Sequence, residues 1–157
     1  MNHPLKRHEA LKPLSKDHHH GLLLCWKIRE GKKKEVAPER IKSYTDFFYR
    51  SQLIPHFKFE EEEIFVLLGE DHPLVKRAMT EHSRLHHLFG ESDNIERALS
   101  EIEKELEDHI RFEERVLFNE LQQEASLDQL ENLKNKEEEV ETPDPDAWED
   151  KFWLKQN

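Results

Sequence analysis

The chain has 157 residues, enough for one domain whose hydrophobic core needs no disulfide bonds. Apolar residues make up 35% of the chain and charged residues 38%, with only four glycines, a balance typical of helices with wide solvated faces. The formal net charge of −11 argues against nucleic acid as a partner, and no apolar stretch is long enough to span a membrane. A single cysteine, Cys25, excludes an internal disulfide. Together with a charged N-terminus that does not resemble a signal peptide, it leads us to expect a cytoplasmic protein.

The charges are unevenly distributed along the chain. Residues 1–34 hold nine Lys or Arg against three acids, whereas the remainder holds fifteen against thirty-two. We interpret this asymmetry as a basic helix that lies on acidic ones. The alternative is a docking surface for a protein partner, which the basic first helix or the aromatic residues near the C-terminus would provide.

Helical periodicity predominates, and no stretch alternates convincingly between apolar and polar residues. We expect four long helices, at about residues 14–30, 38–68, 71–90 and 93–123. Gly31, Gly69 and Gly90 are expected to end the first three. A short polar helix at 126–139 and an extended tail at 141–153, held by its aromatic side chains, should follow.

Starts of the later helices carry recognisable signals. Pro38 suits a first turn, Asp71 is the expected cap before Pro73, and Ser92 or Asp93 is the expected cap of the fourth long helix. Short connections favour antiparallel neighbours. The predicted fold is therefore an all-α, antiparallel up-down-up-down four-helix bundle over residues 1–125, with residues 126–157 packed on it as a polar helix and tail.

The predicted second helix contains a proline in its interior, a position where proline is unfavourable. Pro55 has no N–H group and clashes with the preceding turn, which costs about 3 kcal/mol in a helix interior. The helix should kink or be interrupted immediately before His56.

Two decapeptides share a pattern fifty-three residues apart. They are HFKFEEEEIF at 56–65 and HIRFEERVLF at 109–118, and both read His-x-x-Phe-Glu-Glu-x-x-(Ile or Leu)-Phe. A His and a Glu four residues apart lie on one helix face, about 6 Å from each other along the axis. Both side chains can therefore reach one metal ion, or the carboxylate can bridge two.

Histidines fall on the inward face of every long helix, near its middle. The candidate inward residues are His18, His56, Glu60, His82, His86, His109 and Glu113. A lone core histidine is usually just hydrogen-bonded, but two buried carboxylates with no Lys or Arg on the same faces need a compensating cation. We therefore predict a metal site rather than a set of structural core residues.

This constellation resembles the hemerythrin family, in particular bacterial hemerythrin-like proteins with His-His-Glu cation-binding domains. The resemblance covers nearly the whole chain and rests on four segments: LSKDHHHGLLL at 14–24, the decapeptide at 56–65, TEHSRLHH at 80–87 and the decapeptide at 109–118. It implies a four-helix bundle that holds two non-haem iron ions. By this likeness one iron would have His18 and His56, the other would have His82, His86 and His109, and Glu60 and Glu113 would bridge them.

Several alternatives remain open at the level of the sequence. The last carboxylate is a Glu four residues after its His, whereas oxygen-carrying hemerythrins have an Asp five residues after it. In DHHH we choose His18 because it follows an acid and lies in line with Leu14 and Leu22, whereas His19 and His20 point away. Glu61 and Glu114 are expected to be solvated or to act as outer partners of the ligands, and the further alternative is that they become ligands themselves if the carboxylates shift. Imidazole and carboxylate donors suit iron but also accommodate Mn or Zn.

The resemblance implies a di-iron protein that binds O2, or a related small ligand such as NO or peroxide, as a carrier, sensor or scavenger. This expectation favours a binding protein over an enzyme. The alternatives are a di-iron oxidase or peroxidase, a protein that repairs iron centres after nitrosative damage, and a regulatory module stabilised by a redox-silent metal.

Overall fold

The computed structural model describes residues 6–137 and 143–154. Within these residues every regular element is helical. The first rod is α1 (Lys12–Lys33), which follows a short 3-10 turn, η1 (Glu9–Leu11). The second rod is a long helix interrupted by π-helical segments; it consists of α2 (Pro38–Phe48), η2 (Tyr49–Leu53), α3 (Ile54–Phe59), η3 (Glu60–Ile64) and α4 (Phe65–Leu68). The third rod is α5 (Pro73–Phe89). The fourth consists of α6 (Ile95–Phe112), η4 (Glu113–Leu117) and α7 (Phe118–Glu124), and the short helix α8 (Leu127–Glu137) follows it.

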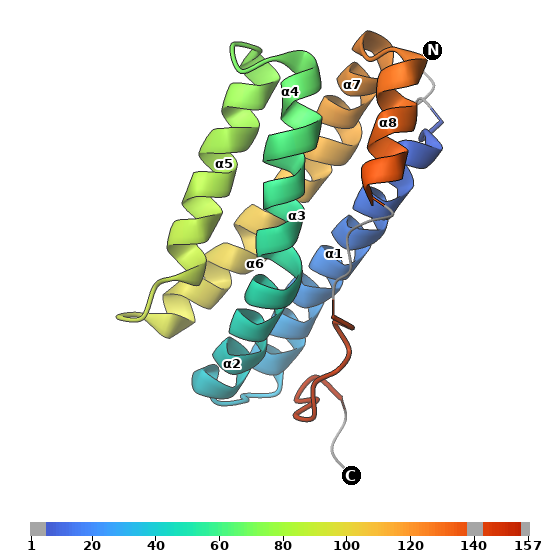
Figure 1. The fold of residues 1–157 in the computed structure, drawn as a ribbon. Helices are drawn as coiled ribbons and strands as arrows, with labels where there is room; N and C mark the ends of the chain where they lie inside the picture. Colours follow the sequence, from blue (N-terminus) through green and yellow to red (C-terminus); the bar gives the residue numbers. More distant parts are fainter. Residues whose placement is uncertain (1–5, 138–142, 155–157) are drawn as a thin grey trace.

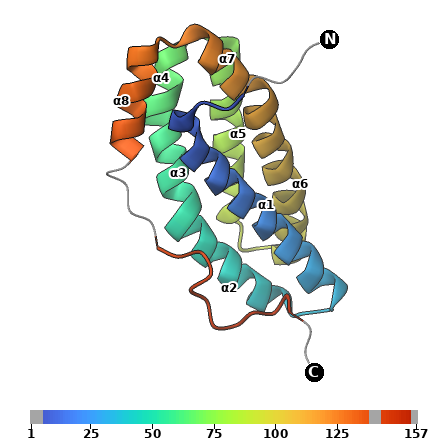
Figure 2. The ribbon, with the colours of Figure 1, turned by 90° about the vertical axis from the view of Figure 1, so that its right-hand side faces the viewer.

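The four longest rods lie side by side, and consecutive rods run in opposite directions (Figures 1 and 2). Helix α6 packs against both α1 and α5, while α2 packs against α1 and α6. Helix α8 contacts the η1 turn at one end of the molecule. Among the described residues, no helix combines the length and hydropathy needed to cross a membrane.

Two apolar clusters form the core, with a polar layer between them. Along α1, Leu14 belongs to one cluster and Leu24 to the other, and the buried His18 lies between them. Helix α5 repeats this order around His82. Because apolar packing on both sides excludes water, polar groups in this layer must find partners within the protein.

The ends of the helices follow the predicted glycines in two of three cases. Gly69 ends α4 with a φ of 95°, and Gly90 caps α5. The predicted caps at the N-termini were wrong by one or two residues. His72 caps α5 by accepting from the Leu74 N–H at 3.1 Å, and Asn94 caps α6 by accepting from the Arg97 N–H. These side chains are the ones positioned next to the free N–H groups of the first turn.

Gly31 does not end the first helix, contrary to the prediction. Helix α1 continues through it to Lys33. A Cβ atom on Gly31 would lie 2.7 Å from Cδ1 of Ile41 and 2.8 Å from Cε2 of Phe152. The glycine is therefore needed for close packing of α2 and the tail on α1, not for a turn.

Pro55 interrupts its helix as predicted, and it does so through a widened turn. The π-helical segment η2 comes directly before α3, and the Ile54 N–H bonds the carbonyl of Tyr49, five residues earlier. A wider turn leaves room for the ring of Pro55 and absorbs its missing N–H group.

Aromatic side chains anchor the tail, as expected, over the part that the structure describes. Phe152 and Trp153 are buried in the same cluster as Tyr44, and Trp148 stacks on Phe47 with 4.9 Å between ring centroids. Positions 138–139 of the predicted polar helix and 141–142 of the predicted tail lie outside the described residues.

Candidate metal centre

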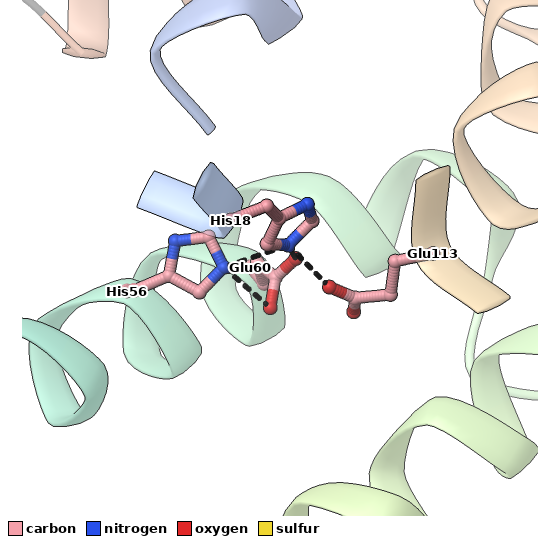
Figure 3. Close-up of side chains that lie close together, drawn as sticks. All are labelled: His18, His56, Glu60 and Glu113. Atoms are coloured by element: carbon pink, nitrogen blue, oxygen red, sulfur yellow. Dashed lines mark hydrogen bonds and ion pairs between the residues drawn. The ribbon is translucent and has the colours of Figure 1, made fainter. Parts of the chain in front are cut away.

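The polar layer brings together six of the seven predicted ligands. Each long rod contributes at least one of them, and all six are at least 95% shielded from solvent: His18, His56, Glu60, His82, His109 and Glu113. They form two groups whose donor atoms lie within 4.8 Å of one another. One group contains His18 and His56 with Glu60 and Glu113 (Figure 3), and the other contains His82 and His109 with the same two glutamates.

All four Nε2 atoms face the two shared carboxylates. His18 Nε2 lies 2.9 Å from Glu113 Oε1, and His109 Nε2 lies 3.2 Å from Glu113 Oε2. On the other side, His56 Nε2 and His82 Nε2 lie 3.3 and 3.2 Å from the same oxygen, Glu60 Oε1. Glu60 and Glu113 therefore stand between the histidine pairs, where each can bridge two ions.

Both shared glutamates begin a π-helical segment. Glu60 is the first residue of η3, and Glu113 is the first residue of η4. In such a turn the residue five positions later returns to the same face, and both Phe65 and Phe118 are indeed buried. The repeated decapeptide thus produces the same local distortion twice, with an inward carboxylate followed by an inward phenylalanine.

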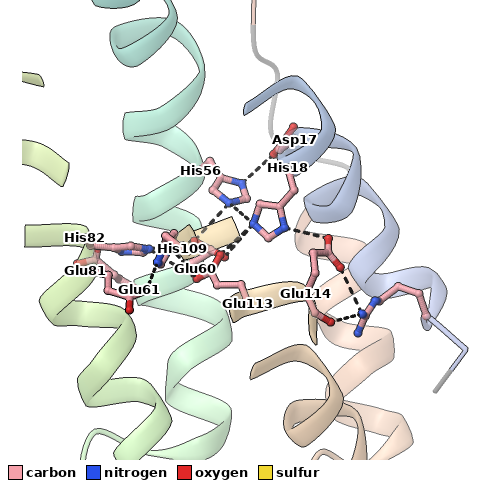
Figure 4. A network of polar contacts seen from close by, with 11 residues as sticks. Asp17, His18, His56, Glu60, Glu61, Glu81, His82, His109, Glu113 and Glu114 are labelled. Atoms are coloured by element: carbon pink, nitrogen blue, oxygen red, sulfur yellow. Dashed lines mark hydrogen bonds and ion pairs between the residues drawn. The ribbon is translucent and has the colours of Figure 1, made fainter. Parts of the chain in front are cut away.

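Each of the four histidines is held from outside by a different carboxylate. The Nδ1–carboxylate distances are 3.0 Å for His56 with Asp17, 3.0 Å for His82 with Glu61, 2.7 Å for His109 with Glu81, and 2.9 Å for His18 with Glu114 (Figure 4). Since an ionised carboxylate can only accept, each Nδ1 is the donor, which leaves the Nε2 lone pair of a neutral ring pointing inward. This is the arrangement that metal-binding histidines usually show.

The contacts have an approximate twofold symmetry that follows the chain. Asp17 and Glu81 directly precede a ligand histidine and bond the histidine of the next rod. Glu61 and Glu114 directly follow a shared glutamate and bond a histidine of the other pair. The sequence left open whether Glu61 and Glu114 would be solvated or act as outer partners of the histidines, and the structure shows them as outer partners. Asp17 and Glu81 were missed as outer partners, although the acid directly before His18 and before His82 was a visible signal.

Several inward atoms have no hydrogen-bond partner among the described residues. They are both carboxylate oxygens of Glu60, Oε2 of Glu113, and Nε2 of His82 and of His109. In addition, Nε2 of His18 and Nε2 of His56 face each other at 3.2 Å. Lone pairs that converge in a buried layer are costly unless a cation satisfies them, so the donor set fits bound metal ions.

The pKa values of the buried side chains in the metal-free protein also indicate that this layer needs a cation. Burial alone would lower the pKa of His56, but the carboxylates of Glu60 and Asp17 outweigh it and raise this pKa to about 10. The pKa of His109 is raised to about 9, against burial, mainly by Glu113. Burial tends to raise the pKa of Glu113, yet the surrounding histidines hold it well below its ordinary value. The layer thus contains excess negative charge that draws in protons when no metal is bound.

His86 stands apart from both groups. Its Nδ1 is hydrogen-bonded to the hydroxyl of Tyr49, and it belongs to neither set of converging donors among the described residues. The side chain of His19 is exposed and that of His20 is half-buried. Thus only His18 of the three consecutive histidines lies in the centre.

The single cysteine plays no part in the centre. Cys25 is fully buried in an apolar cluster, and burial raises the pKa of its thiol to about 12. The donors that converge are therefore imidazole nitrogens and carboxylate oxygens only.

A scan against protein-family models and searches of curated proteins and of solved structures find no match to this chain. Its function is therefore inferred from the residues of the site and their geometry.

Proposed function

We propose that this chain is a di-iron protein with a hemerythrin-like antiparallel four-helix bundle. It binds O2, or a related small ligand such as NO or peroxide, as a carrier, sensor or scavenger. The observation that carries the proposal is the pair of four-donor groups that share Glu60 and Glu113. Two carboxylates common to two sets of histidines are suited to hold two ions as neighbours.

The donor set narrows the choice of metal. Imidazole and carboxylate without thiolate suit iron, manganese and zinc. The two shared and four outer carboxylates carry six formal negative charges, of which Arg7 beside Glu114 and Arg77 beside Glu81 offset two. Among these metals we choose iron, because two iron ions held here would supply the redox chemistry that O2 binding requires.

The protein's own residues bind the metals and keep the centre dry. The outer carboxylates hold each ring in the tautomer and orientation that binding needs. Aromatic rings then cover the ligands: Phe57 stacks on His82 with centroids 4.0 Å apart, and Phe118 stacks on His18 at 5.3 Å. A water-free environment of this kind protects a bound small ligand from side reactions.

Two observations support other functions. Each group offers two nitrogens and two carboxylates, and four such donors also suit tetrahedral zinc, which would make the chain a redox-silent module. With His86 bonded to Tyr49, neither metal would have a third histidine, and both would keep open positions. Open positions on both ions also suit the second candidate, a di-iron oxidase, peroxidase or iron-centre repair protein.

Metal analysis and absorption spectra of protein from iron-supplemented cells test the proposal. We expect two irons per chain and near-ultraviolet charge-transfer bands that bleach on reduction and return in air. The bands should be lost in His18→Ala and Glu113→Ala but kept in His19→Ala, a matched control at the exposed neighbouring histidine. Zinc without charge-transfer bands would contradict the di-iron proposal, and bands that survive in His18→Ala would contradict the ligand assignment.

A further inference from the structure

A cavity of about 320 Å³ lies beside the candidate metal centre, lined by residues of α1, α3, the end of α8 and residues 143–145 of the tail. Asp17 and His56 form part of its wall. Asp17 Oδ2 accepts the hydrogen bond from His56 Nδ1, so the cavity is separated from the inward ligands by one side chain (Figure 4). A ligand pocket of this size suits a small molecule.

Three acidic side chains line the cavity, together with the basic side chains of Lys16 and His20. The side chains of Asp17, Glu137 and Asp144 supply carboxylates. The wall also contains four prolines, which have no N–H groups: Pro13, Pro55, Pro143 and Pro145. The Pro145 carbonyl accepts from the hydroxyl of Tyr44. The amide of Gln52 already donates to the carbonyl of Pro143. An occupant that donates hydrogen bonds therefore complements this wall better than one that accepts them.

The carboxylate of Glu137 in this wall has no hydrogen-bond partner among the described residues. Both of its carboxylate oxygens are shielded from solvent and have no hydrogen bond among the described residues. The nearby lysines of α8 are engaged elsewhere, Lys134 with Glu9 and Lys136 with Glu63. Lys16 also lines the cavity, but its side chain is exposed and forms no ion pair with Glu137 within the described ranges. Burial, together with the charge of Asp17, raises the pKa of Glu137 to about 8.

We propose that this cavity binds a small organic amine, whose ammonium group pairs with the carboxylates of Glu137 and Asp17. The apolar body of the amine packs against Leu14, Phe59 and the proline rings. The ammonium supplies the donors and the positive charge that Glu137 lacks. This assignment goes beyond the metal centre and does not depend on which metal is bound.

An organic cation fits this cavity better than a metal ion. Glu137 is not part of any group of three or more converging metal-binding donors among the described residues. A compact ion would thus leave most of its coordination positions to water. An amine needs only two acceptors, and its carbon body uses the apolar walls that a metal ion would leave empty.

Calorimetric titration of the metal-free protein tests the proposal without involving the metal centre. The probe is 2-phenylethylamine, and its neutral counterpart is 2-phenylethanol. We expect the amine to bind with a Kd of about 1 mM or below and at least about tenfold more tightly than the alcohol. Glu137→Gln, which keeps the side-chain shape, should weaken amine binding by at least about tenfold. Glu131→Gln, at an exposed position of the same helix, should bind as the wild type does.

Two results would overturn this assignment. One is equal binding of amine and alcohol, or no amine binding, because the carboxylates would then have no role in recognition. The other is unchanged amine binding by Glu137→Gln in a protein whose melting curve matches the wild type. Since metal content is measured separately, neither result bears on the di-iron proposal, and loss of that proposal would leave this one standing.

Discussion

Replacing Glu61 with glutamine tests whether the outer carboxylates matter for metal binding. Glu61 Oε2 accepts from His82 Nδ1 at 3.0 Å, and 31% of the Glu61 side chain is exposed. Glutamine keeps the shape but removes the charge that makes the imidazole a stronger ligand. Loss of such an outer partner lowers metal affinity by about 10–100-fold, and partial solvent screening places Glu61→Gln near tenfold, about 1.4 kcal/mol.

Competition titration against a chelator, with Co(II) or Zn(II), measures this affinity directly. The matched control is Glu62→Gln, which changes the adjacent, exposed residue of the same π-helical segment. We expect Glu62→Gln to bind metal as the wild type does. The reasoning is refuted if Glu61→Gln also binds like the wild type, or if both variants lose affinity equally, because the effect would then not come from His82.

Three further predictions concern pH and the packing of the tail. In the folded metal-free protein the pKa of His109 is raised to about 9 and that of His56 to about 10, above their ordinary value of 6.5. The protonated forms of these two histidines therefore stabilise the fold, and this stabilisation is fully present below pH 6.5. It should disappear as the pH rises through about 9 and 10, which urea unfolding at each pH would show. Gly31→Ala should reduce the free energy of unfolding by about 1 kcal/mol, since overpacking against Ile41 and Phe152 exceeds the helix-propensity gain. Phe152→Ala should reduce it by about 3–5 kcal/mol and red-shift the tryptophan fluorescence.

Each of these three predictions has a control measurement whose result could contradict it. Metal-loaded protein should lack the loss of stability between pH 6.5 and 10, because metal replaces the protons on the ligands. A loss of equal size with metal bound would rule out the assigned histidines. Gly90→Ala serves as the control for Gly31→Ala, since its Cβ would make only ordinary contacts. Leu154→Ala, at an exposed tail position, should leave stability unchanged.

Helices and most of the inward residues could be predicted from the sequence because they depend on local periodicity. A 3-4 spacing of apolar residues defines the buried face of a helix, and the histidines and glutamates on that face stood out because burying charge is costly. The same logic located Pro55 as an interruption. It did not reveal that the interruption is a π-helical turn, nor that similar turns begin at Glu60 and Glu113.

Sequence spacing could not decide which neighbouring residues turn toward the centre. His86 lies four residues after His82 and shares its helix face, yet its Nδ1 bonds Tyr49. Asp17 and Glu81 precede ligand histidines, but each bonds a histidine from a different rod. These pairings depend on the rotation and height of one helix against the next, which local periodicity does not determine.

The amino-acid sequence by itself determined that this protein is helical and that a repeated His-x3-Glu pattern faces its core. Only the tertiary structure decided that four further carboxylates orient the rings, that His86 stands apart from both histidine pairs, and that Gly31 gives room to Phe152. The physical reason is distance along the chain. Helix formation and amphipathic faces arise from residues three or four apart, whereas the candidate metal centre and the tail contacts join side chains from separate rods.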